Sequence, residues 1–60
     1  MSNDLVQISC YGTTAVLPRR EALSLYAEAM AASEGHEHLR YSHIHECLLA
    51  GDKVITDEEV

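Results

Sequence analysis

The feature of this sequence that most constrains its fold is residues 18–51, a stretch with apolar residues at helical spacing. Apolar residues that recur every three or four positions form one face of an amphipathic helix. Gly35 interrupts the stretch near its middle and Gly51 closes it. Glycine ends helices because it adopts the left-handed conformation without strain. The stretch therefore predicts two helices, over residues 19–33 and 36–50.

Each predicted helix carries more apolar surface than a single narrow stripe. Leu39 and Leu49 fall outside the inward row of the second helix, which indicates a further contact surface. The joint at Gly35 is too short for anything but an immediate turn, which favours an antiparallel helical hairpin. The residues predicted to face the core are Ala22, Leu23, Leu25, Tyr26, Ala29, Met30 and Ala32 in the first helix, and Tyr41, Ile44, Cys47 and Leu48 in the second.

A β-hairpin is predicted before the helices. Residues 5–11 alternate between apolar and polar, which is the period of a half-buried strand. Gly12-Thr13 suits a type II′ turn, and residues 14–17 return as the second strand. The β-branched segment 53–56 predicts a possible third short strand. We therefore expect an α+β fold in which the hairpin packs on the helical hairpin, with element order ββαα or ββααβ. The apolar side chains expected to lie on the helices are Val6, Ile8, Cys10 and Val16.

The length of 60 residues predicts one domain over residues 1–60, with residues 1–4 and 57–60 as flexible ends. Asp57-Glu58-Glu59 reads as a solvated acidic end. A core this small is marginally stable, and oligomerisation is the expected source of further buried area. Cys10 and Cys47 form no paired motif, so we expect reduced thiols. No signal peptide or membrane segment is visible, which predicts a cytoplasmic protein without membrane contact.

The net charge of the chain limits the classes of molecule that it is expected to bind. Ten acidic residues against four Lys and Arg give a formal net charge of −6. Binding to nucleic acid requires a basic face for the phosphates, so direct nucleic-acid binding is not expected. An acidic surface can instead attract a basic groove on another protein.

Four histidines lie between residues 36 and 45, and His43 and Cys47 are one helical turn apart. This spacing is typical of a two-ligand metal clamp. A straight helix spreads residues 36–47 over about 16 Å, so His36 cannot join the same ion. We therefore predict no bound metal or cofactor, with His43 and Cys47 as weak candidate ligands. Cys47 also lies on the inward row, so it is not expected to be a nucleophile, and we predict that the chain is not an enzyme.

The joint between the two helices contains the other residues of interest. We expect Ser33, Glu34 and Gly35 to stop and restart the helix, with Arg40 reaching back to Glu34 or Glu37 and Tyr41 packed beneath.

Several short motifs lie between residues 15 and 58. Their positions are Glu21, Ala22, Tyr26, Glu28, Met30, Ser33, Glu34, Gly35, Arg40, Tyr41, Ile44, Leu48, Gly51, Val54, Asp57 and Glu58. At these positions the chain resembles short uncharacterised proteins of mobile elements from Gram-positive gut bacteria. This family has no established activity, so the resemblance implies none.

Two functions are consistent with these features. The first is a protein-interaction module that self-associates as a homodimer, because the chain has more apolar residues than so short a sequence can bury. Its predicted contact residues are Leu25, Met30, Leu39 and Leu49. The alternative is an acidic inhibitor or decoy that binds the basic nucleic-acid-binding groove of another protein.

Overall fold

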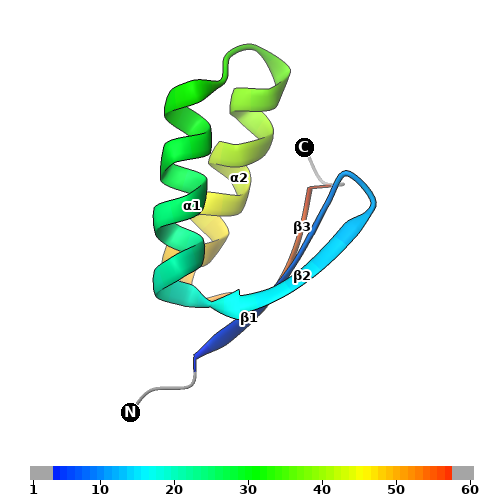
Figure 1. Cartoon of the computed structure of the whole chain (residues 1–60), viewed down its shortest axis with the longest axis vertical. Coiled ribbons are helices and arrows are strands. Elements are labelled where there is room, and N and C mark those ends of the chain that lie inside the picture. Colours follow the sequence, from blue (N-terminus) through cyan, green and yellow to red (C-terminus); the bar gives the residue numbers. More distant parts are fainter. Residues whose placement is uncertain (1–3, 58–60) are drawn as a thin grey trace.

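The computed structural model describes residues 4–57, which form a three-stranded sheet and two helices (Figure 1). This is the predicted α+β fold in its ββααβ form, so the expected fold class is confirmed. The elements are β1 (Leu5–Cys10), β2 (Thr13–Pro18), α1 (Arg19–Ala32), α2 (His36–Ala50) and β3 (Val54–Thr56).

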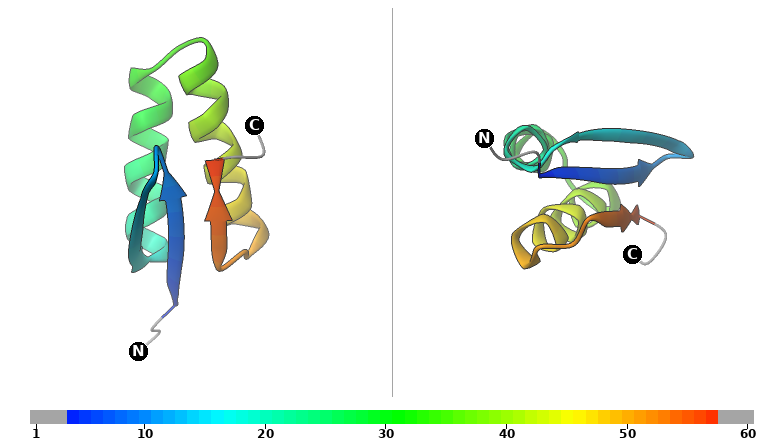
Figure 2. Two further views of the ribbon diagram at one scale, coloured as in Figure 1. Left: turned by 90° about the vertical axis from the view of Figure 1, so that its right-hand side faces the viewer. Right: turned by 90° about the horizontal axis from the view of Figure 1, so that it is seen from below.

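The strand order in the sheet is β2-β1-β3. The hairpin partner β2 runs antiparallel to β1, and β3 returns after the helices to lie parallel to β1 on its other side. Figure 2 shows α1 and α2 side by side on one face of this sheet. The hairpin is thereby joined to a third strand and a helical layer, which is what a two-stranded hairpin needs to be stable in water.

The hairpin turn is Tyr11-Gly12, one residue earlier than the predicted Gly12-Thr13. Cys10 pairs with Thr13, and the two turn residues have φ of 55° and 78°. A type I′ turn requires positive φ at both central positions, and its twist matches that of the strands. Glycine supplies this conformation readily at the second position, whereas Tyr11 adopts it as a non-glycine residue.

The core lies between the sheet and the helix pair. It consists of the buried residues Val6, Ile8, Ala22, Ile44, Leu48 and Ile55. Val16 does not belong to it, so its predicted placement was wrong. Val16 pairs with Gln7, and directly paired residues on antiparallel strands point to the same face, here the face away from the helices. Leu17, opposite Val6, points inward instead.

The helix boundaries agree closely with the expected ones, although Gly35 has a different role. Helix α1 ends at Ala32, and Ser33 caps it in an extended conformation. Gly35 has φ 69° and ψ −138°, which is not left-handed helical, and it precedes the first residue of α2. Gly51 ends α2 in the left-handed conformation, as predicted, with φ 95° and ψ 9°.

The helical and sheet layers approach each other where β2 runs into α1, and they diverge towards the hairpin turn (Figure 1). We call the side where β2 runs into α1 the narrow end, and the side of the hairpin turn the open end. One arginine connects the two layers at each end. Arg19 links the segments at the narrow end, and Arg40 lies at the open end beside the hairpin turn.

Candidate interaction surface

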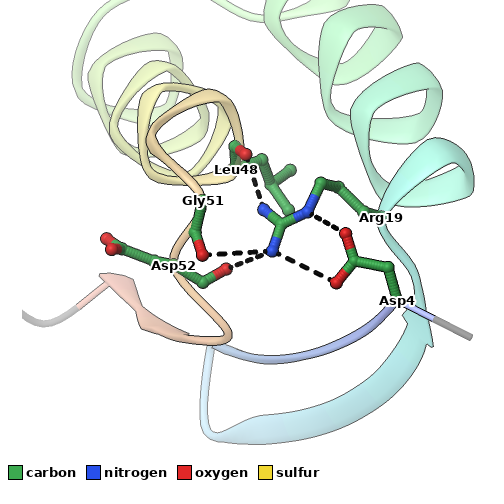
Figure 3. A network of polar contacts seen from close by, with 5 residues as sticks. All are labelled: Asp4, Arg19, Leu48, Gly51 and Asp52. Atoms are coloured by element: carbon green, nitrogen blue, oxygen red, sulfur yellow. Dashed lines mark hydrogen bonds and ion pairs between the residues drawn. The ribbon is translucent and has the colours of Figure 1, made fainter.

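Arg19, the first residue of α1, links the start of that helix to the residue before β1 and to the end of α2 (Figure 3). Its Nε donates to Oδ2 of Asp4 at 2.6 Å, and its Nη1 donates to the Leu48 carbonyl at 2.6 Å. Its Nη2 donates to the carbonyls of Gly51 and Asp52 at 3.2 and 3.0 Å. The last carbonyls of a helix have no partner within the helix, and here the guanidinium supplies one for α2.

The same ion pair anchors the chain before β1. The hydrogen bond from Arg19 holds the pKa of the Asp4 carboxyl below its usual range. The backbone N–H of Arg19 also donates to the Asp4 carbonyl at 2.8 Å. The predicted flexibility of residues 1–4 stays a prediction: Asp4 is held by these two contacts, and residues 1–3 lie outside the described part of the chain.

Asp57 has a corresponding role at the open end. It is buried, and its Oδ2 accepts hydrogen bonds from the Tyr11 backbone N–H at 3.1 Å and from Arg40 Nη1 at 2.8 Å. These bonds, first that from Tyr11, lower the pKa of the Asp57 carboxyl. The prediction of a solvated Asp57 was wrong, because the residue after β3 is anchored at the hairpin turn. Glu58 and Glu59 lie outside the described residues.

The prediction that Arg40 reaches back to the helix joint was wrong. Its guanidinium pairs with Asp57 and lies over the Tyr11 ring, 4.6 Å from the ring centroid. The buried carboxylate at the end of β3 attracts Arg40 more strongly than an exposed glutamate would, because solvent screens exposed pairs. Glu37 instead accepts a hydrogen bond from the Tyr11 hydroxyl at 3.2 Å.

Three aromatic rings contact one another where the helices face the hairpin turn. The Tyr41 ring lies 6.5 Å from that of Tyr11 and 6.0 Å from that of Tyr26. Partial desolvation and the hydrogen bond to Glu37 raise the pKa of the Tyr11 phenol to about 12. Tyr41 thus packs between the helices and the hairpin, and these contacts stabilise the positive φ of Tyr11.

The remaining joint residues serve the helix ends. The Ser33 hydroxyl donates to the Ala29 carbonyl at 2.7 Å, and His38 Nδ1 donates to the Met30 carbonyl at 2.9 Å. Glu34 is exposed. This part of the fold is a local capping arrangement for α1.

The candidate metal ligands lie side by side on α2. His43 Nε2 is 3.8 Å from Cys47 Sγ, as expected for residues one turn apart. Within residues 4–57, no group of three or more His, Cys, Asp and Glu residues is placed to hold a metal ion.

The four apolar residues predicted to make contacts between copies are dispersed over the helices. Leu25, Leu39 and Leu49 are exposed, and Met30 is half-buried. Leu39 and Leu49 are separated by about 15 Å along α2 and by about 80° around it. They do not form one compact apolar patch on that helix.

The sheet presents a more compact apolar surface on the side away from the helices. We call this the open sheet face, and Leu5, Val16 and Val54 on it are 50%, 61% and 72% exposed. Val16 and Val54 both lie beside Gln7, so they are within two strand spacings, about 10 Å, of each other. None of its side chains is charged. The open sheet face consists of Leu5, Gln7, Ser9, Thr14, Val16, Pro18, Val54 and Thr56.

The sequence contains an indication of this face. Each strand carries two adjacent apolar residues: Leu5-Val6, Val16-Leu17 and Val54-Ile55. Adjacent residues of a strand point to opposite faces, so one of each pair must lie away from the helices.

Strand β2 forms an edge of the sheet. No strand within residues 4–57 pairs with its outer side. All its residues except the half-buried Leu17 are exposed, and none is charged. Ala15 is exposed even though its pairing with Ile8 puts it on the helix side, because the helical and sheet layers diverge towards the hairpin turn (Figure 1). Natural proteins usually protect such an edge with charged residues, so this one is open to pairing.

No protein-family model, curated protein or solved structure matches this chain. The resemblance to mobile-element proteins therefore stays a prediction. Neither described helix has the length and apolar character needed to cross a membrane.

Proposed function

We propose that this chain is a small protein-interaction module that self-associates through its sheet. The observation that carries the proposal is the uncharged open sheet face with its adjoining edge, β2. All residues of β2 except the half-buried Leu17 are exposed, none is charged, and an unprotected edge of this kind favours pairing with another strand.

The absence of charged side chains on the open sheet face and on β2 allows a second copy to approach there, although the chain as a whole is acidic. Two copies that each carry a formal charge of −6 repel one another in general. Contact through this uncharged surface removes no charged side chain from water, so it adds no desolvation cost to the general repulsion. Within residues 4–57 the core contains six buried apolar residues, and so small a core also gains from additional burial.

The acidic decoy is less favoured. It needs acidic groups that are available to a basic partner. Asp4 and Asp57 instead pair with Arg19 and Arg40 within the chain, and Glu37 accepts a bond from Tyr11. The acids that the structure leaves for such a role include Glu21, Glu28 and Glu46, which are exposed on two different helices.

Sedimentation velocity between about 1 µM and 1 mM tests the proposal. We expect the mass to rise from one chain to two, with a dissociation constant in the micromolar range or weaker, because a small sheet buries less than the ~1,600 Å² of a standard interface. A monomer at every concentration would refute self-association.

A pair of double variants locates the surface. Val16→Lys with Val54→Lys charges the sheet, and Leu39→Lys with Leu49→Lys charges α2 equally. Only the sheet variant should dissociate the dimer. Loss of the dimer in the helix variant alone would restore the predicted helical contact surface.

A further inference from the structure

The backbone of β2 has unpaired hydrogen-bonding groups at defined positions. The N–H of Gln7 donates to the Lys53 carbonyl at 2.7 Å, so it points towards β3 and away from β2. Gln7 is paired with Val16. In an antiparallel ladder, residues of a pair that does not exchange hydrogen bonds both point their N–H and C=O groups outward. Val16 therefore presents its backbone groups at the outer edge, and Thr14, two residues earlier, does the same.

The stretch available for pairing is limited at both ends. Before it is the Tyr11-Gly12 turn, and at its end is Pro18, which has no N–H to donate. Residues 13–17 remain, and their midpoint is Ala15. The outward groups of Thr14 and Val16 lie symmetrically about this midpoint, so the edge is complementary to a second copy of itself.

We propose that two copies pair antiparallel through their β2 edges, with Ala15 opposite Ala15 on a two-fold axis. Thr14 of each copy then lies opposite Val16 of the other, and about four backbone hydrogen bonds form. The two sheets become one continuous six-stranded sheet with all four helices on one face, and the two open sheet faces join into a larger apolar surface. This mode of contact rests on the proposed function and specifies the partner as a second copy.

Ala15 and its surroundings fit this arrangement. The small side chain lies on the axis, where the two copies are closest. It is exposed although it lies on the helix side, because the two layers diverge towards the hairpin turn (Figure 1). Like charges directly opposite one another destabilise a strand pair, and β2 contains none.

The test uses two variants of the full chain, which is short enough for chemical synthesis. N-methylation of Val16 removes the outward donor and blocks the edge while leaving every side chain unchanged. Val54→Lys is the control, because it charges the open sheet face on β3, away from the β2 edge. Circular dichroism confirms that each variant is folded.

Edge pairing predicts that N-methylation of Val16 weakens dimerisation at least about tenfold, whereas Val54→Lys leaves the dissociation constant within about threefold. If Val54→Lys weakens the dimer and N-methylation of Val16 does not, the open sheet faces stack on each other. This would overturn edge pairing and leave self-association standing. If neither variant weakens the dimer, edge pairing is also overturned. A wild-type chain that is monomeric throughout would refute both proposals.

Amide hydrogen exchange of the unmodified chain gives a second readout that requires no variant. The amides of Thr14 and Val16 should exchange rapidly at low concentration and at least about tenfold more slowly where the dimer predominates. Unchanged exchange at these two amides in a sample that is fully dimeric would contradict the pairing.

Discussion

Arg19 offers the sharpest test of how this small fold is held together. Its side chain hydrogen bonds to Asp4 and to the carbonyls of Leu48, Gly51 and Asp52, and it is 16% exposed. Replacement by methionine keeps the apolar stem of the side chain and removes the donors. The fold then loses the link between the start of α1, the end of α2 and the residue before β1.

The expected loss in the free energy of unfolding follows from how exposed each of these hydrogen bonds is. The bonds to Gly51 and Asp52 are exposed, so water replaces them at little cost. The short bonds to Asp4 and Leu48 are partly buried, and net hydrogen bonds to charged groups are worth ~1.5–3 kcal/mol each. Because Asp4 is partly solvated, we expect Arg19→Met to lower the free energy of unfolding by about 2–3 kcal/mol.

This loss is large for a chain of this size. At ~0.05–0.15 kcal/mol per residue, the whole fold is stable by about 3–9 kcal/mol. The melting temperature should fall by about 8–24 °C, at ~4–8 °C per kcal/mol.

Urea denaturation followed by circular dichroism, at one fixed protein concentration, measures the change. Arg20→Met is the matched control, because it removes the same charge from an exposed neighbour and should change stability by less than about 0.5 kcal/mol. Arg19→Lys restores the charge but not the planar fork, and should recover less than half of the loss. Equal stability of the Arg19→Met and Arg20→Met chains would refute the role of Arg19 argued from these contacts.

Three further predictions concern the core and the titrating groups. Ile44→Ala should cost about 2–5 kcal/mol in urea denaturation, whereas Leu49→Ala on the exposed side of α2 should cost less than about 0.5 kcal/mol; similar costs would contradict the assigned core. The folded-state pKa values of Asp4 and Asp57 are lowered, so their contribution is present above the unfolded value of ~3.9 and is lost as pH falls through the folded values. Asp57→Asn should therefore flatten the loss of stability below about pH 4, and an unchanged acid profile would oppose this. Ultraviolet titration should show a phenol ionising near pH 12, and Tyr11→Phe should remove that ionisation; an unchanged titration curve would contradict the assignment to Tyr11.

The sequence by itself determined the elements. The helical spacing of residues 18–51 predicted both helices, and the alternation after Leu5 predicted β1. Gly51 ended α2 as expected, because glycine alone adopts a φ of 95° without strain. These features depend on local conformational preferences, which a short stretch of sequence expresses directly.

The turn of the hairpin was displaced by one residue because its type depends on the contacts of Tyr11. A tyrosine with a φ of 55° is unfavourable in isolation. Arg40, Tyr41 and Asp57, all distant in sequence, stabilise it here. No local pattern around residue 11 indicates those partners.

Only the tertiary structure decided which charges are paired and which apolar residues remain in solvent. Arg40 was expected at the helix joint and instead binds Asp57, because β3 returns parallel to β1 and brings residue 57 to the hairpin turn. Val16 was expected in the core and instead lies outside, because the strand register pairs it with Gln7. Register and the return path of β3 are set by packing between segments far apart in the chain, and that packing determines whether an apolar or charged side chain faces the core, a partner residue or water.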